Sequence, residues 1–233
     1  MQKTVLAILL IMCATISYAQ SIVPRAGLTL STVSVSDDDE DLDLKSVIGF
    51  TIGAGFNFPV SEIISLQPEL NFIRKGFKGE NSYHENFDGY EYSEDSEAKV
   101  ALNYLEVPVL AKFSFGGETK FFLIAGPSFG IGLGGKAKEK YSYVEKINGQ
   151  VVESESDSET TKVKFGDASE EDEAIYFENR LDLGLQFGAG VLIKNRIAIE
   201  ARYGLGLSSL VEDTDVMNRV VQFSVAMPFS LSK

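Results

Sequence analysis

The stretch that most constrains the fold of this chain is residues 181–207, where apolar side chains alternate with glycine. Apolar residues occupy every second position from Leu181 to Ile193 and again from Ile197 to Leu207, and Lys194-Asn195 lies between the two arms. A period of two places successive side chains on opposite faces of a strand. The stretch is therefore predicted to form an antiparallel β-hairpin with a tight turn.

The composition of the two faces indicates where the hairpin lies. In a soluble sheet the exposed face carries long polar side chains, but here the face opposite the apolar one is mostly glycine with a few charges. Glycine suits the crowded interior of a small closed barrel, and a continuous apolar face suits contact with lipid. Each arm also exceeds the roughly 9–11 residues that a tilted strand needs to cross a bilayer.

The same alternation recurs through the rest of the chain. It predicts further strands at about 23–33, 47–58, 63–75, 99–115, 120–134 and 221–231. The eight strands are joined by connections that alternate strictly between long and short, which is typical of barrels with short periplasmic turns and long outer loops. We predict an all-β, eight-stranded antiparallel up-and-down transmembrane β-barrel with both termini in the periplasm. Aromatic residues near the short turns are expected to form an interfacial girdle: Phe56, Phe58, Phe113, Phe115, Phe121, Phe122 and Phe229.

The first 19 residues have the three parts of a secretory signal. Lys3 precedes an apolar run from Val5 to Ile16, and Ser17-Tyr18-Ala19 fits a cleavage site. We predict that 1–19 is a cleaved signal peptide and that 20–233 is the barrel domain. The single cysteine, Cys13, lies inside the signal, so disulfides, zinc–thiolate sites and cysteine nucleophiles are excluded from the mature chain.

The net charge of −13 argues against a nucleic-acid partner, because no basic stripe is present to neutralise phosphates. Most of the 34 acidic residues fall in the predicted long extracellular loops, at about 36–44, 78–98, 136–178 and 211–217. Within the longest of these, Asn148-Gly149 suggests a small hairpin.

Seven charged residues are predicted to point into the barrel: Arg25, Glu69, Glu106, Lys112, Asp182, Glu200 and Arg202. An eight-stranded barrel has an interior about wide enough for its own side chains, so charges enclosed there must pair. A network of ion pairs that plugs the lumen is the favoured interpretation. A narrow, gated ion path through the lumen is the alternative.

The predicted loops hold three further candidate groups. His84 has no partner motif for catalysis, so a solvated histidine and a protein without enzymatic activity are predicted. Asp37, Asp39 and Asp41 form a weak Ca²⁺ candidate, although the glycine and closing glutamate of an EF-hand loop are missing; no cofactor is predicted. Tyr83, Phe87, Tyr90 and Tyr92, together with Tyr141 and Tyr143, either form a recognition surface or pack on one another.

Three motifs resemble a known family. The segment from Asn103 to Phe113, with Tyr104-Leu105-Glu106-Val107-Pro108 at its centre, resembles a strand of Bacteroidetes outer-membrane β-barrel proteins, the porin-like or PorT-like family. Leu66-Gln67-Pro68-Glu69-Leu70 before Lys75-Gly76 is similar to the preceding strand of that family, and Ala125-Gly126-Pro127 to the following one. The resemblance implies the fold and the outer membrane of a Bacteroidetes-type bacterium. It allows service to a secretion machine but leaves the biochemical role open.

These observations predict an outer-membrane barrel with a structural or surface-recognition role. Its expected partners are outer-membrane lipid and lipopolysaccharide, and a protein of the cell surface or of a secretion machine. A narrow ion or solute channel is the first alternative. A soluble, lipocalin-like binder of a small apolar ligand is the second, and it is disfavoured because the predicted interior is glycine and charge.

Overall fold

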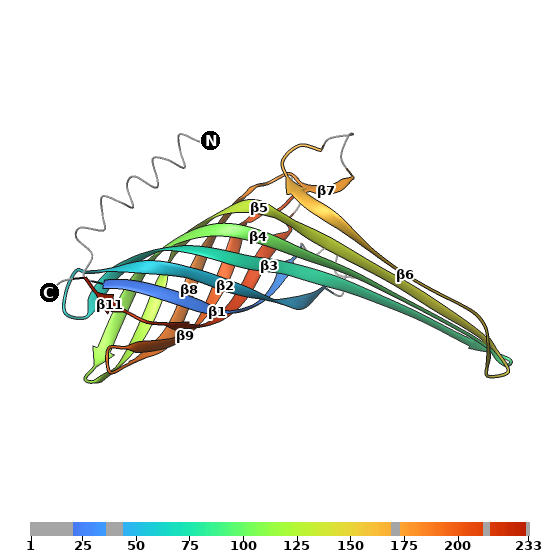
Figure 1. The fold of residues 1–233 in the computed structure, drawn as a ribbon, viewed down its shortest axis with the longest axis horizontal. Helices are drawn as coiled ribbons and strands as arrows, with labels where there is room; N and C mark the ends of the chain where they lie inside the picture. Colours follow the sequence, from blue (N-terminus) through green and yellow to red (C-terminus); the bar gives the residue numbers. More distant parts are fainter. Residues whose placement is uncertain (1–20, 36–43, 169–172, 212–214, 232–233) are drawn as a thin grey trace.

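The computed structural model describes residues 21–35, 44–168, 173–211 and 215–231. The predicted signal peptide and the acidic run that contains Asp37, Asp39 and Asp41 lie outside these residues. The described chain forms a single sheet of eleven strands (Figure 1): β1 (Ser21–Ser34), β2 (Leu44–Pro59), β3 (Ile64–Phe87), β4 (Tyr90–Gly116), β5 (Thr119–Ile147), β6 (Gln150–Phe165), β7 (Ala174–Phe177), β8 (Leu181–Ile193), β9 (Ile197–Ser209), β10 (Met217–Ala226) and β11 (Phe229–Ser230).

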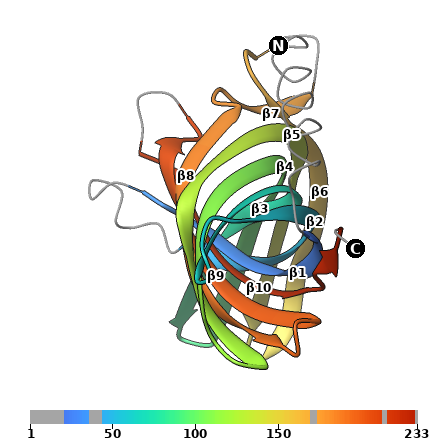
Figure 2. The ribbon, with the colours of Figure 1, turned by 90° about the vertical axis from the view of Figure 1, so that its left-hand side faces the viewer.

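Eight of these strands close into a barrel. β1 to β5 pair in sequence, β5 pairs with β8, and β8, β9 and β10 follow in order. The ring is completed by β10 and β1, and every pairing within it is antiparallel. Figure 2 looks at the ring from the end that carries the short turns. The predicted eight-stranded up-and-down barrel is confirmed.

The apolar faces of the strands point outward. Leu183, Ile199 and Phe223 lie on three neighbouring strands and are 43%, 53% and 59% exposed, whereas Glu200 and Arg202 are buried in the interior. Leucine and phenylalanine are stable at such exposure when hydrocarbon, and not water, surrounds them. The outward apolar surface and the alternating pattern therefore have one cause, which is that lipid replaces water outside the barrel.

Glycine on the inner face makes room for large side chains in the lumen. A Cβ atom at Gly190 would lie 2.3 Å from Cζ of Phe122, and one at Gly132 would lie 2.5 Å from Cε2 of Phe165. Both distances are far below van der Waals contact, so each aromatic ring occupies the space that a side chain would need. The glycine-rich face of the sequence is thus the face against which the lumen packs.

The short turns gather at one end of the barrel, together with β11 and the beginning of β1 (Figure 1). The turn between β8 and β9 contains Lys194 and Asn195 with φ of +49° and +53°. Two consecutive residues with positive φ match the right-handed twist of the strands that they join. The predicted tight turn at this position is confirmed.

The opposite end differs from the prediction, because two of the predicted loops are strands. β3, β4 and β5 continue far beyond the ring, and β6 pairs with the extension of β5. The result is a sheet of β3, β4, β5 and β6, which Figure 1 shows projecting from the barrel. We call the paired segments 80–97 and 139–159 the blade.

The blade closes with two turns, at Asp88-Gly89 and at Asn148-Gly149, all four residues having positive φ. The second of these is the hairpin that the sequence predicted. The prediction of loops at 78–98 and in most of 136–178 was wrong, since side chains on both faces of the blade are largely polar and give no apolar period to detect. β7 then runs parallel to the base of β6.

Candidate functional site

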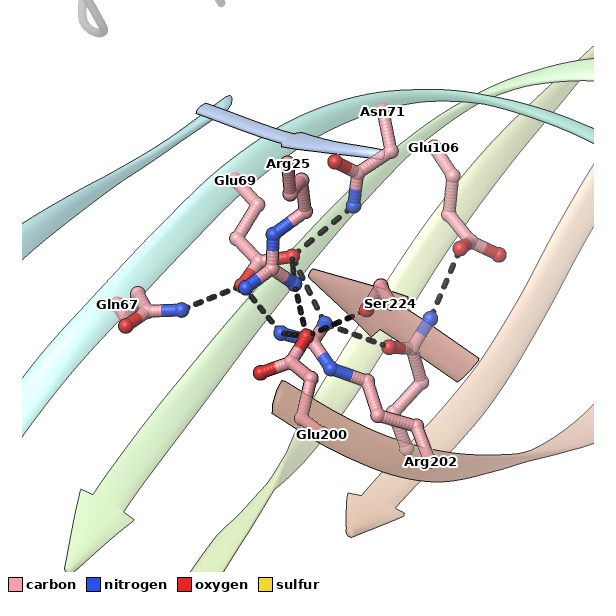
Figure 3. A network of polar contacts seen from close by, with 9 residues as sticks. Arg25, Gln67, Glu69, Asn71, Glu106, Glu200, Arg202 and Ser224 are labelled. Atoms are coloured by element: carbon pink, nitrogen blue, oxygen red, sulfur yellow. Dashed lines mark hydrogen bonds and ion pairs between the residues drawn. The ribbon is translucent and has the colours of Figure 1, made fainter. Parts of the chain in front are cut away.

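The first candidate site is the barrel interior, where four of the predicted charges meet (Figure 3). Arg202 forms two contacts with Glu69, from Nη1 to Oε2 and from Nη2 to Oε1, each at 2.8 Å. Arg25 Nη1 lies 2.7 Å from Glu69 Oε2 and 3.0 Å from Glu200 Oε1. Arg202 Nη2 lies 2.9 Å from Glu200 Oε1. The four residues form a charge-neutral network that we call the arginine network.

Polar side chains satisfy much of the remaining bonding capacity of its carboxylates. Gln67 Nε2 donates to Glu69 Oε1 at 2.6 Å, and Asn71 Nδ2 donates to Glu69 Oε2 at 3.0 Å. Ser224 Oγ donates to Glu200 Oε1 at 2.9 Å. A buried ion pair is stable only when such hydrogen bonds offset the cost of removing both charges from water.

A second network lies beside the first, toward the blade. Lys75 Nζ lies 2.7 Å from both Glu106 Oε1 and Asp182 Oδ2. Gln186 connects the two networks, because its Nε2 donates to Glu106 Oε2 at 2.8 Å while its Oε1 accepts from Arg202 Nη1 at 3.4 Å. The structure thus distributes six of the seven predicted inward charges between two linked networks.

Lys75 was missing from the predicted set of lumen charges. The alternation along β3 nevertheless predicts an inward position for Lys75, on the same face as Glu69 and Asn71, and the structure places it there. It serves as the common cation for Glu106 and Asp182, which otherwise would lie together without one.

Lys112 is the predicted inward charge that belongs to neither of the two networks. Its Nζ lies 4.0 Å from the centre of the Phe122 ring, a cation–π contact, and it lines a pocket of the short-turn end with Lys120. Phe122 itself is almost fully buried, so the prediction that it belongs to an outer aromatic girdle was wrong. Phe113, Phe115, Phe121 and Phe229 do face outward.

Apolar layers lie on both sides of the ionic networks. Toward the short turns, Val23, Leu110, Phe122, Ile124, Ala198 and Ala226 form one buried cluster. Toward the blade lies another: Val33, Ile73, Leu102, Tyr104, Ala137, Val163, Phe177, Leu210 and Val220. The sequence prediction of an interior of glycine and charge missed these layers, because isolated apolar residues on the inner face do not disturb the outward pattern.

The second candidate site is the blade, whose two faces differ in charge. Following the register from inward-facing Tyr104 along β4, the face continuous with the barrel interior carries eight carboxylates and no lysine: Glu85, Glu94, Glu139, Glu145, Glu153, Glu155, Asp157 and Glu159. We call it the acid–tyrosine face. The opposite face, continuous with the outer surface of the barrel, holds Lys140 and Lys146 in ion pairs with Glu97 and Glu91 at 2.8 and 3.3 Å.

Four tyrosines of the acid–tyrosine face form a connected ladder. Ring centres lie 6.2 Å apart for Tyr83 and Tyr92, 6.1 Å for Tyr92 and Tyr143, and 6.1 Å for Tyr143 and Tyr141. The sequence left open whether these rings pack together or form a surface for recognition. The structure shows that they pack together, on a face that no other described element covers.

Hydroxyl groups of the ladder bond to neighbouring carboxylates. Tyr143 Oη donates to Glu153 Oε1 and Tyr92 Oη to Glu94 Oε2, each at 2.8 Å. The hydrogen bond to Glu153 raises the pKa of Tyr143 to about 12, and the bond to Glu94 raises the pKa of Tyr92. These two hydrogen bonds connect rings of the ladder to carboxylates of the same face.

The remaining candidates that the structure describes are His84 and Phe87. His84 is exposed on the face opposite the ladder, and its Nδ1 lies 3.1 Å from Ser93 Oγ. Phe87 is 74% exposed and lies opposite Tyr90 at the blade tip. Among the residues that the structure describes, no group of three or more His, Cys, Asp or Glu side chains is placed to hold a metal ion.

Comparison with known proteins gives a family match. The model of a family described as "Outer membrane protein beta-barrel domain" matches residues 18–212. A comparison with curated proteins found no match. Within the described residues, no helix has the length and apolar character needed to span a bilayer.

Several solved structures are similar in fold. Ail, the attachment invasion locus protein of Yersinia pestis in complex with the heparin analogue sucrose octasulfate, is 17% identical; the match covers 90% of this chain and 99% of Ail with a TM-score of 0.40. Neisserial surface protein A is 14% identical over 89% of this chain and 97% of its own, also with a TM-score of 0.40. The translocator domain of the autotransporter NalP from Neisseria meningitidis is 12% identical over 98% of each chain, with a TM-score of 0.27.

Proposed function

Since this chain belongs to the outer membrane protein β-barrel domain family, we propose that it anchors the blade at the surface of a bacterium as a recognition element. In this proposal the short turns and both termini are periplasmic, and the blade projects outside the cell. The observation that carries the proposal is the blade itself: a four-stranded sheet, exposed on both faces, with its tyrosines and most of its acids collected on one of them.

The segregation of side chains between the faces supports recognition. Both faces of the blade contact solvent, so folding alone does not require that every lysine of the blade lie on one face and the tyrosine ladder on the other. Aromatic side chains supply large contact areas to interfaces, and complementary charge directs partners to them.

The chemistry of the acid–tyrosine face defines the class of partner. Carboxylates accept charge-assisted hydrogen bonds from lysine and arginine, and the faces of tyrosine rings attract the same cations. We propose a protein or polypeptide partner with clustered lysine and arginine side chains. A secretion-machinery component and another surface protein are both compatible with this chemistry.

The lumen geometry supports an anchoring role over transport. An ion that crossed the barrel would have to separate the arginine network and pass both apolar layers, each formed by buried side chains. The lipocalin-like alternative is disfavoured by the same filling and by the apolar outer surface.

A blade-excised variant tests the proposal. Asn-Gly would replace residues 80–97 and also 139–159, so that the strands of the ring close directly with two short hairpins. We expect the intact protein to bind a fluorescent lysine-rich peptide in a salt-sensitive way. We expect the variant to lose this binding but to retain the heat-modifiable gel mobility of a folded barrel. Equal binding by both forms would overturn the proposal, as would failure of a protease to cut the blade on whole cells.

A pair of matched double variants locates the binding face. Glu153→Gln/Glu155→Gln removes two charges from the acid–tyrosine face, and Glu91→Gln/Asp95→Asn removes two from the opposite face. We expect the first variant to weaken peptide binding at least tenfold and the second to change it less than twofold, because only the first removes acceptors beside the tyrosines. Equal effects would show general electrostatic attraction in place of a defined surface.

A further inference from the structure

Four lysines cluster at the base of the blade, on the outward side of the barrel. Lys99 lies directly opposite Lys138, and Lys136 lies directly opposite Lys162. Lys136 and Lys138 are two residues apart on β5, so the four side chains occupy adjacent positions on one face of β4, β5 and β6. We call them the lysine quartet.

The quartet faces outward and is exposed. Tyr104 points into the lumen, and β4 pairs with β3 without a register shift from there to its start, so Lys99 lies on the opposite, outer face. Lys138 and Lys136 share that face, since Ala137 between them is buried in the lumen cluster. All four lysines are exposed.

Two neighbouring lysines outside the quartet form ion pairs with a glutamate. Lys45 and Lys78 continue the row of Lys99 and Lys138 onto β2 and β3, and both bind Glu80, Lys45 at 2.7 Å. These contacts lower the pKa of Glu80 to about 2. Within the described part of the chain, no carboxylate lies within ion-pairing distance of any quartet lysine, although like charges directly opposite one another destabilise a sheet.

The height of the quartet matches the headgroup layer. Leu133, 51% exposed, is the last outward apolar residue of β5 before Lys136. Three residues along a tilted strand correspond to roughly 8 Å along the barrel axis, which places Lys136 and Lys162 just outside the hydrocarbon and Lys99 and Lys138 one step beyond. The phosphate groups of membrane lipids lie in this layer.

We propose that the lysine quartet is a binding site for the phosphate groups of an anionic glycolipid in the outer leaflet. Directly opposite side chains lie about 5 Å apart at Cβ, so the flexible ammonium groups of two or more lysines can converge on one phosphate. A protein with a net charge of −13 would repel such a lipid elsewhere on its surface, and the quartet reverses the charge where the lipid meets it. The assignment to the outer leaflet rests on the proposed orientation of the blade.

Native mass spectrometry of the full-length mature protein in a neutral detergent tests the site independently of orientation. The probes are bis-phosphorylated lipid A, the same lipid with its phosphates removed, and inorganic phosphate. We expect the bis-phosphorylated lipid to bind in preference to the dephosphorylated lipid, and inorganic phosphate at equal concentration not to displace it. Equal binding of both lipids would overturn the proposal, and displacement by phosphate would show a site for the free ion.

Two variants with the same change of charge identify the residues. Lys99→Gln/Lys138→Gln removes one row of the quartet, and Lys140→Gln/Lys146→Gln removes two ion-paired lysines farther along the same face. At about 1 kcal/mol for each lysine near an anionic surface, the first variant is expected to bind the phosphorylated lipid roughly 30-fold more weakly. The second is expected to change binding less than threefold, and equal losses would overturn the assignment.

Stability without lipid gives a second readout. In lipid-free neutral detergent, Lys99→Gln/Lys138→Gln is expected to unfold at a higher temperature than the unmodified protein, because it removes repulsion between directly opposite charges. Added phosphorylated lipid is expected to reverse that order. Lys99→Arg/Lys138→Arg keeps the charge and is expected to keep lipid binding; its loss would contradict a site based on phosphate attraction. Failure here leaves the blade experiments unaffected, since those do not involve the quartet.

Discussion

Arg202 illustrates at the scale of one residue how the lumen is stabilised. Its guanidinium contacts Glu69 through both terminal nitrogens and Glu200 through one of them, while Gln186 accepts a further hydrogen bond. The planar fork of arginine matches two carboxylate oxygens at once, which lysine cannot do. Removal of either partner leaves a buried charge without compensation, and this asymmetry makes the contact testable.

The substitution Arg202→Met is therefore expected to lower the free energy of unfolding by about 3–5 kcal/mol. Arg202→Met/Glu69→Gln is expected to lower it less, because Arg25 and Glu200 then remain as a neutral pair. Urea unfolding in detergent micelles measures both.

An exposed ion pair provides the control. Lys146→Met removes the contact of Lys146 with Glu91 at 3.3 Å on the blade and should cost less than about 1 kcal/mol, since water screens that pair. Similar losses for Arg202→Met and Lys146→Met would show that burial does not govern the lumen network.

At the scale of elements, the extension of three barrel strands into the blade determines what the protein presents. Register within the ring fixes which strands are neighbours. β3, β4 and β5 stay paired with one another beyond the ring, where β6 replaces β8 as the second partner of β5. The blade gains no apolar core from this arrangement. Cross-strand pairs, including the tyrosine ladder and its bonded carboxylates, are the contacts that hold it together.

These contacts predict a dependence on alkaline pH. The pKa of Tyr143 is raised from 10.0 to about 12, chiefly by its hydrogen bond to Glu153. A group whose pKa is higher in the folded state stabilises the fold fully below its unfolded pKa. The contribution of this bond is therefore present below pH 10 and is lost as the pH rises toward 12.

The substitution Glu153→Gln should return the titration of Tyr143 toward pH 10, since an amide does not carry the charge that disfavours tyrosinate. Ultraviolet absorbance of tyrosinate during an alkaline titration gives the measurement. Glu159→Gln, on the same face but without contact to Tyr143, is the control and should leave the curve unchanged. An unchanged curve for Glu153→Gln would contradict the observed bond.

At the scale of the whole molecule, the lumen consists of an apolar layer, the ionic networks and a second apolar layer along one axis. In the plugged lumen that we propose, ion passage would require both apolar layers to open and at least one buried ion pair to separate. Each of these changes is unfavourable because water is excluded from the layers.

The purified protein is accordingly expected to show no steady, resolved conductance in planar bilayers at neutral pH, under conditions in which a general porin conducts. Conductance steps that scale with the number of inserted molecules would contradict a closed lumen and support the narrow channel. The blade-excised variant should also stay closed, because the layers lie within the ring and not in the blade.

The sequence by itself determined the membrane barrel. In a strand with lipid on one side and a crowded interior on the other, almost every outward residue must be apolar and many inward residues must be small. This requirement produces a clear period of two in the sequence. That period predicts the number of strands in the ring, the turn at Lys194-Asn195 and the inward direction of charges such as Glu69 and Arg202.

Only the tertiary structure decided which distant residues meet. Lys75 contacts Asp182, which is 107 positions away, because the ring places β3 and β8 around one lumen. The local alternation of residues cannot predict a contact between positions so far apart in the sequence. The strands of the blade were not predicted, for a related reason. Where water contacts both faces of a sheet, no apolar period is required, and the pairing is set by the strands that the membrane has already aligned.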